Sequence, residues 1–206
     1  MTTKNICIWG DSIAYGAWDE EGGWADRLRR FLHARTLTSR LEEYYWVYNL
    51  GVPGETSDDL LKRFPAEHAA REPHIALFAV GINDSSHREK GMGPRVPIEH
   101  FRENINELLQ QAKKDAEIVV CIGLTTIDED AVAAEDDIDC DFRHEEVIRY
   151  DAVLRDASRE SNVLFVDMQN TLSPEDLIDG LHPSAEGHRK MFEHILDFLA
   201  AHGVIR

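Results

Sequence analysis

The sequence has few basic residues. It contains 22 lysines and arginines against 39 aspartates and glutamates, which gives a formal net charge of −17 at pH 7. Proteins that bind nucleic acid neutralise phosphates with basic patches, and this sequence has no such patch. The acidic balance also disfavours strongly anionic surfaces and substrates. We therefore expect no nucleic acid among the partners of this chain.

Long apolar runs are missing as well. None approaches the roughly 18 residues that suggest a membrane-spanning helix, so we expect no integral membrane association. The first apolar run, Ile6–Trp9, is too short for the core of a secretory signal peptide, and no small-residue cleavage site follows it. We predict a cytoplasmic protein, with a mature chain that has lost its signal as the alternative. The sequence does not indicate the oligomeric state.

Cysteine is scarce. Cys7, Cys121 and Cys140 are an odd number, are widely spaced and form no CxxC pair. This pattern gives no disulfide framework. Cys7 and Cys121 lie in apolar strand-like runs, where a cysteine packs as a small hydrophobic residue. The histidines show no mutual spacing typical of metal ligands, so we expect no metal site.

The sequence does contain a regular alternation of two patterns. Short apolar runs bounded by Gly, Asn, Asp or Pro are typical of buried strands; they are Ile6–Trp9, Tyr45–Leu50, Ile75–Val80, Ile118–Ile122 and Val163–Val166. Longer segments have apolar residues at helical spacing; they are Trp24–Leu37, Ser57–Arg71, Ile98–Ala112, Glu145–Arg159 and Ala185–Ala201. The alternation predicts a single α/β domain over residues 1–206, with a mostly parallel five-stranded sheet and helices on both faces.

Two segments depart from this pattern. Pro65 interrupts the helical segment 57–71 and predicts a kink or a restart of the helix there. Asp128–Glu146 is rich in acidic residues and has little apolar periodicity. We expect a solvated surface loop in this segment, with a mobile flap beside the functional site as the alternative.

Ligands of open α/β sheets bind beyond the carboxyl ends of the strands, so the residues that follow each strand are the candidates for a binding or catalytic site. Gly10-Asp11-Ser12 follows the first predicted strand, Gly51 the second, and Gly81-Ile82-Asn83-Asp84 the third. Asp179 and His182 lie in a longer loop after the fifth strand. These polar and glycine-rich loops should meet at one edge of the sheet.

The pair Asp179 and His182 has the spacing of a base with an orienting partner. Pro183 biases His182 towards extended backbone, as in a rigid loop. There Asp179 can hydrogen-bond one ring nitrogen and leave the other free to take a proton. Such a base can activate a serine hydroxyl, and Ser12 is the candidate nucleophile. Taken alone, a serine after an aspartate is more often a helix cap.

An acyl transfer reaction also needs donors for the developing oxyanion. The backbone N–H groups of Ser12 and Gly51 and the side-chain amide of Asn83 together make a candidate oxyanion hole, in which removal of one donor costs about 3 kcal/mol. Gly51 and Asn83 are each, taken alone, ordinary turn residues. Tyr15 and Trp18, just past Ser12, are the candidates for lining the substrate pocket.

Four blocks carry a resemblance to a known family. Gly10-Asp11-Ser12, Gly51, Gly81-x-Asn83-Asp84 and Asp179-x-x-His182-Pro183 resemble, in order, the signature blocks of the SGNH hydrolases, also called the GDSL esterase/lipase family. The resemblance implies a flavodoxin-like three-layer α/β/α fold and serine-dependent ester hydrolysis without a metal or other cofactor. It makes Ser12 the nucleophile, His182 the base and Asp179 its orienting partner, with Ser12, Gly51 and Asn83 as oxyanion donors. Ile13 stands where the family name has leucine.

We therefore predict a hydrolase of small-molecule acyl esters, with short-chain or O-acetyl esters favoured. Thioesters, long-chain lipids and lysophospholipids are alternative substrates for the same site. A non-catalytic carbohydrate-binding module on the same fold is a rival of another class, which the intact set of Ser12, Asp179 and His182 disfavours. A nucleotide-binding protein is disfavoured because the loop Gly10–Gly16 lacks the lysine and the glycine spacing of a Walker motif.

Overall fold

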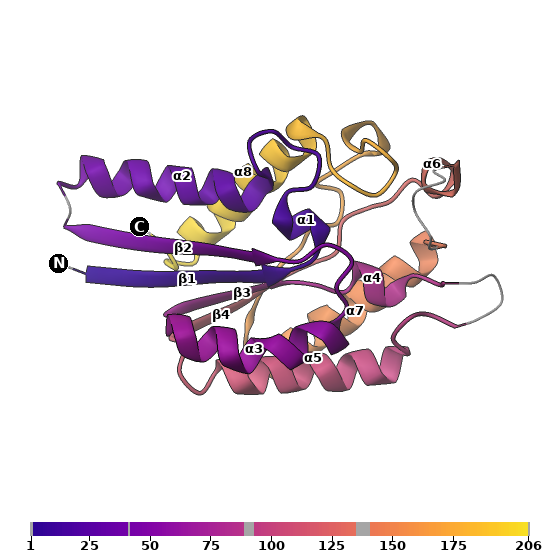
Figure 1. Ribbon diagram of the computed structural model, residues 1–206, viewed down its shortest axis with the longest axis horizontal. Coiled ribbons are helices and arrows are strands. Elements are labelled where there is room, and N and C mark those ends of the chain that lie inside the picture. Colours follow the sequence, from indigo (N-terminus) through magenta and orange to yellow (C-terminus); the bar gives the residue numbers. More distant parts are fainter. Residues whose placement is uncertain (1, 41, 89–92, 135–140, 206) are drawn as a thin grey trace.

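The computed structural model describes residues 2–40, 42–88, 93–134 and 141–205. A five-stranded parallel sheet runs through the molecule in the order β2-β1-β3-β4-β5 (Figure 1). Its strands are β1 (Thr2–Gly10), β2 (Glu43–Gly51), β3 (Ile75–Ala79), β4 (Ile118–Ile122) and β5 (Leu164–Val166). Helices α2 (Gly23–Thr38) and α8 (Ala185–Ala201) cover one face, and α3 (Ser57–Arg71), α5 (Ile98–Ala112) and α7 (His144–Glu160) cover the other (Figure 1). This is the three-layer α/β/α fold that the sequence predicts.

The core lies on both faces of the sheet, which explains why the strands read as unbroken apolar runs. Four consecutive residues of β1, Ile6 to Trp9, are fully buried. Cys7 in β1 and Cys121 in β4 are free thiols inside this core. Burial raises the pKa of both thiols to about 12, so they stay protonated and unreactive.

The helices bury most of the apolar residues that lie at helical spacing, although Phe31 of α2 and Ile148 of α7 are exposed. In α8, for example, Met191, Ile195 and Leu199 are buried on the side of the helix that faces the sheet. The predicted restart at Pro65 is wrong, because α3 runs unbroken from Ser57 to Arg71 with the proline inside it. Phe64, next to this proline, is buried, and this packing holds the helix together where its backbone lacks a donor.

The register of the sheet aligns the ends of its first three strands. Gly10, the last residue of β1, is paired with Gly51 of β2 on one side and Ala79 of β3 on the other. The loops that follow these strands therefore start at the same edge of the sheet. This edge contains the topological switch point, because the chain places β2 on one side of β1 and β3 on the other. The short helices α1 (Ser12–Tyr15), α4 (Ile82–Ser85) and α6 (Glu129–Ala134) lie at this edge (Figure 1).

The acidic segment is only partly described. Residues 129–134 form α6, a short helix that the sequence analysis does not anticipate, and residues 135–140 lie outside the described part of the chain. The surface-loop and flap interpretations of this segment therefore stay predictions. Among the helices of the described residues, none is both long enough and apolar enough to cross a membrane.

Candidate active site

Ser12 lies at the sharp turn between β1 and α1. It is the first residue of α1, and Asp11 caps that helix by accepting the N–H of Ile13 at 2.9 Å. Gly10 lets α1 approach the sheet, because a Cβ there would lie 2.6 Å from the Cβ of Ala14 in α1. The turn thus fixes Ser12 at the strand edge, where it is 7 % exposed.

His182 and Asp179 lie on a tight loop closed by an antiparallel bridge between Leu177 and Pro183. The N–H of Ile178 donates to the carbonyl oxygen of His182 at 2.8 Å across the base of this loop. Oδ1 of Asp179 accepts the backbone N–H groups of Leu181 (3.0 Å) and His182 (2.7 Å). These bonds turn the other carboxylate oxygen of Asp179 towards the imidazole.

Three side chains from opposite ends of the chain form one line of hydrogen bonds. Oδ2 of Asp179 lies 2.6 Å from Nδ1 of His182, and Nε2 of His182 lies 2.9 Å from Oγ of Ser12. An ionised carboxylate can only accept, so Nδ1 carries the proton, and Nε2 accepts the hydroxyl hydrogen of Ser12. The side chains of His182 and Asp179 are 12 % and 13 % exposed, which leaves the ring accessible from one side.

The charge on Asp179 is strongly stabilised. Burial raises the pKa of this carboxyl, but the hydrogen bonds from the His182 ring and backbone outweigh burial and lower the pKa to about 2. Asp179 is therefore ionised at any pH at which the protein is expected to work. A fixed negative charge beside Nδ1 stabilises an imidazolium when Nε2 takes a proton.

Two of the three predicted oxyanion donors have an N–H group that can still bind a substrate oxygen. The N–H of Ser12 is at the first position of α1, where it has no acceptor within the helix. Asn83 lies in α4, and its side-chain amide donates one N–H to the carbonyl oxygen of Glu55 at 2.9 Å, which leaves the second. Both residues are buried at the strand edge.

The assignment of Gly51 as the third donor needs correction. Its N–H donates to Oδ1 of Asn49 at 3.0 Å and so is not free to receive a substrate oxygen. Gly51 instead makes room for α1, because a Cβ there would lie 2.4 Å from the backbone nitrogen of Tyr15. The need for glycine at the end of β2 is thus explained by packing.

Gly54, three residues further on, is a residue that the sequence analysis missed. Val52 and Glu55 close a turn around it (Glu55 N–H to Val52 oxygen, 3.2 Å), and its φ of 76° is that of the third residue of a type II turn. Within the described residues its N–H has no partner, and a Cβ would meet nothing within 4 Å. The bond from Asn83 to Glu55 holds this turn beside Asn83. The Pro-Gly pair at 53–54 was the signal for it.

Asp84 links two of these loops. Both of its carboxylate oxygens accept the N–H of Ser57, the first residue of α3, at 3.0 and 3.1 Å. It therefore ties the start of α3 to α4. Burial, together with the charge of Asp11, raises the pKa of Asp84 to about 7, and burial raises the pKa of Asp11 to about 6.

The two predicted pocket residues point to different places. Trp18 lies against the site: its ring is nearly perpendicular to that of His182, at 83°, with the ring centroids 6.1 Å apart. Tyr15 is 55 % exposed and lines a cavity of about 550 Å³ along β2, together with Asn49 and Tyr48. Among the described residues, no group of three or more His, Cys, Asp or Glu side chains could hold a metal ion.

Comparison with known proteins agrees with this fold. The model of the GDSL-like lipase/acylhydrolase family matches residues 8–190. A rice relative (Oryza sativa subsp. japonica), GDSL esterase/lipase WDL1, is 24 % identical over 204 residues, which cover 93 % of this chain and 76 % of the relative.

Solved structures show the same fold. The lipase/acylhydrolase from Enterococcus faecalis superposes with a TM-score of 0.79 at 23 % identity, covering 97 % of this chain and 96 % of that one. Axe2, an acetylxylan esterase from Geobacillus stearothermophilus, gives a TM-score of 0.74 at 22 % identity, covering 94 % and 93 %.

Proposed function

Because this chain belongs to the GDSL-like lipase/acylhydrolase family and is a carboxylic ester hydrolase, we propose that it cleaves short-chain or O-acetyl esters with Ser12, His182 and Asp179. The observation that carries the proposal is the continuous line of hydrogen bonds from Asp179 through His182 to Ser12, at 2.6 and 2.9 Å. Since Ser12 and His182 stand at opposite ends of the sequence, residues 1–206 act in this proposal as one catalytic domain.

The reaction begins when Oγ of Ser12 attacks the ester carbonyl carbon. Nε2 of His182 takes the hydroxyl proton as the new C–O bond forms, and Asp179 stays ionised and stabilises the imidazolium. The carbonyl oxygen becomes an oxyanion. His182 then gives its proton to the leaving alcohol, which departs and leaves the acyl group on Ser12. A water molecule, deprotonated by His182, releases the acyl group by the same steps in reverse.

The oxyanion is held by neutral N–H donors. We assign the backbone N–H of Ser12 and the free amide N–H of Asn83 to this role. The N–H of Gly54 replaces that of Gly51 as the third donor, because it is unpartnered among the described residues and borders Asn83. Donors fixed in a partly buried site stabilise the charge that develops in the transition state, at little reorganisation cost.

The proposal of a small acyl group is supported by a protein of the same fold. Axe2, which shares the fold, is an acetylxylan esterase, and O-acetyl sugars are accordingly the first substrates to test. The reaction as written uses no cofactor. Thioesters and long-chain lipid esters would pass through the same acyl-enzyme, so they are distinguished by turnover rather than by mechanism.

A panel of p-nitrophenyl esters from acetate to palmitate tests the proposal, with acetylated xylo-oligosaccharides and acyl-CoA thioesters beside it. We expect the highest kcat/KM on acetate and loss of turnover in Ser12→Ala. Ser161→Ala, a serine substitution at the far end of α7, is the matched control and should behave like the parent. Hydrolysis that persists in Ser12→Ala would contradict the assignment. A parent that turns over no ester but binds sugar would favour the binding module.

A further inference from the structure

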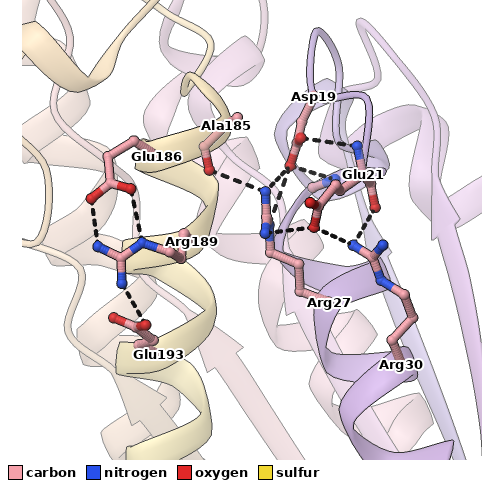
Figure 2. A network of polar contacts seen from close by, with 9 residues as sticks. Asp19, Glu21, Arg27, Arg30, Ala185, Glu186, Arg189 and Glu193 are labelled. Atoms are coloured by element: carbon pink, nitrogen blue, oxygen red, sulfur yellow. Dashed lines mark hydrogen bonds and ion pairs between the residues drawn. The ribbon is translucent and has the colours of Figure 1, made fainter.

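The loop between α1 and α2, residues 16–22, is fastened by one buried carboxylate. The Asp19 side chain is only 1 % exposed. Its Oδ1 accepts the N–H of Glu21 at 3.0 Å, and its Oδ2 accepts the N–H of Gly23, the first residue of α2, at 3.2 Å. Arg27 donates to the same Oδ2 from Nη2 at 2.9 Å and from Nε at 3.3 Å (Figure 2). The loop is thus pinned to the start of α2.

Arg27 also reaches from this loop to the segment that carries His182. Its Nη2 donates to the carbonyl oxygen of Ala185, the first residue of α8, at 3.2 Å, and its Nη1 pairs with Glu21 at 2.8 Å (Figure 2). Ala185 follows His182 by three residues in the sequence. One guanidinium, 14 % exposed, therefore sets the distance between the loop and the start of α8.

A neutral histidine of α8 lies where this loop joins α2. His188 is fully buried, and a Cβ on Gly23 would lie 3.3 Å from its Cε1. Burial lowers the pKa of His188 to about 4, although Asp19 nearby acts to raise it. His188 is therefore uncharged at neutral pH, and the positive partner of Asp19 is Arg27. Burial acts to raise the pKa of Asp19, but the bonds from Glu21 and Arg27 lower it.

This fastened loop presents Trp18 to the imidazole. Trp18 precedes Asp19 directly, has a left-handed backbone with φ of 66°, and is 67 % exposed. An exposed side chain on strained backbone is not held by its own burial. What holds it here is the Asp19 anchor on its C-terminal side. Its ring stands nearly perpendicular to that of His182, with 6.1 Å between centroids.

We infer that Asp19 and Arg27 are positioning residues for the reaction, which act by holding Trp18 against the His182 ring so that Nε2 stays directed at Ser12. Asp179 holds the imidazole through one hydrogen bond to Nδ1, and the ring can still rotate about this bond. The perpendicular indole blocks that motion. The inference rests on the proposed role of His182 as the base.

Kinetics of four variants test this inference with p-nitrophenyl acetate. A base displaced by about 1 Å can cost up to about a hundredfold in rate, so we expect kcat of Trp18→Ala and Arg27→Gln to fall about tenfold each, with KM within about twofold. If Arg27 acts through Trp18, the double variant falls no further than either single one. Trp18→Phe keeps a ring at the same place and should recover most of the lost kcat.

Arg189→Gln is the matched control. Arg189 lies on α8 and pairs only with Glu186 and Glu193 in Figure 2, so its loss should leave kcat unchanged. A double variant whose loss is the product of the single losses would overturn the inference. So would a Trp18→Ala protein with the kcat of the parent, and this variant removes only an exposed side chain, so it decides the matter even if Arg27→Gln does not fold.

A readout that needs no activity separates this inference from the proposed function. The Hε1 resonance of the His182 ring should shift when the Trp18 ring current is lost in Trp18→Ala, and Arg27→Gln should give a shift in the same direction. An unchanged resonance in a folded Arg27→Gln protein contradicts the inference alone. If the resonances shift as expected but the parent hydrolyses no ester, only the proposed function fails.

Discussion

Replacement of Asp179 by asparagine puts an NH2 group in place of one carboxylate oxygen and removes the negative charge of the side chain. Oδ1 would still accept the two backbone N–H groups of Leu181 and His182, so the loop should keep its shape. The new amide would face Nδ1 of His182 with a donor. The imidazole would then favour the tautomer with its proton on Nε2, which cannot accept the hydroxyl hydrogen of Ser12. We expect kcat/KM to fall about 10³- to 10⁴-fold, the size of loss known for such a change in serine hydrolases.

The same substitution should alter stability in a pH-dependent way. The pKa of Asp179 is about 2 instead of its ordinary 3.8, and a difference of one pH unit corresponds to about 1.4 kcal/mol, so the ionised carboxylate stabilises the folded chain by about 2 kcal/mol. Because the folded-state pKa is lowered, this stabilisation is complete above about pH 4 and is lost as the pH falls through about 2. Urea unfolding of parent and Asp179→Asn should therefore differ most at neutral pH and converge in strong acid.

The matched control is Asp176→Asn, three residues upstream. Asp176 is buried and pairs with Lys190 at 2.7 Å, but it does not touch the His182 ring. Its replacement should lower the unfolding free energy and leave kcat/KM of the folded protein near the parent value. If Asp179→Asn keeps kcat/KM within tenfold of the parent, the orienting role of Asp179 is refuted.

Three further predictions concern the loops around Ser12. Asn83→Ala removes a proposed oxyanion donor and should lower kcat for p-nitrophenyl acetate about 10²- to 10³-fold with little change in KM; an unchanged kcat removes Asn83 from the oxyanion hole. Gly51→Ala forces a Cβ against the backbone of Tyr15 and should cost about 2–3 kcal/mol in urea unfolding, whereas Gly54→Ala has space and should cost about 1 kcal/mol from its positive φ; equal losses would contradict the packing role of Gly51. Asp84, with its pKa raised to about 7, should destabilise the fold as the pH rises from about 4 to 7, so a ¹³C titration of its carboxyl should give a midpoint near 7 and Asp84→Asn should flatten that part of the stability curve.

Much of the fold could be predicted because local patterns and the sheet geometry agree. The apolar runs mark the strands, and the carboxyl ends of parallel strands meet at one edge, which brings Ser12 and His182 together across 170 residues. Pro183 indicates the rigid loop on which His182 lies. The short interval between Asp179 and His182 is spanned by an Asx-type turn, which needs no long-range information.

The errors come from contacts between residues far apart in the sequence or from side chains that compete for one donor. The sequence cannot show that Asn49 takes the N–H of Gly51, because both residues are ordinary at the end of a strand. The sequence likewise cannot show that Asp84 reaches Ser57, which lies 27 residues earlier. Pro65 is tolerated within α3 because packing of the helix on the sheet outweighs a local preference.

The bonds that hold Trp18 are also non-local. Arg27 is one of several arginines on α2, and nothing in its spacing distinguishes it from its neighbours. Only the fold places its guanidinium between Asp19 and Ala185, which is 158 residues away. Prediction from the sequence reached Trp18 as a residue near the nucleophile, but not the ion pair that fixes its position.

The central claim is that Ser12 is the nucleophile activated by His182, and covalent labelling with diisopropyl fluorophosphate tests it most directly. The reagent reacts with serine hydroxyls that an adjacent base has activated. We predict one phosphoryl group per chain, mapped by mass spectrometry to the peptide that carries Ser12, with esterase activity lost in step. Ser12→Ala should take up none, and His182→Ala should react far more slowly. A label on another residue, or full activity after Ser12 is completely labelled, would contradict the account.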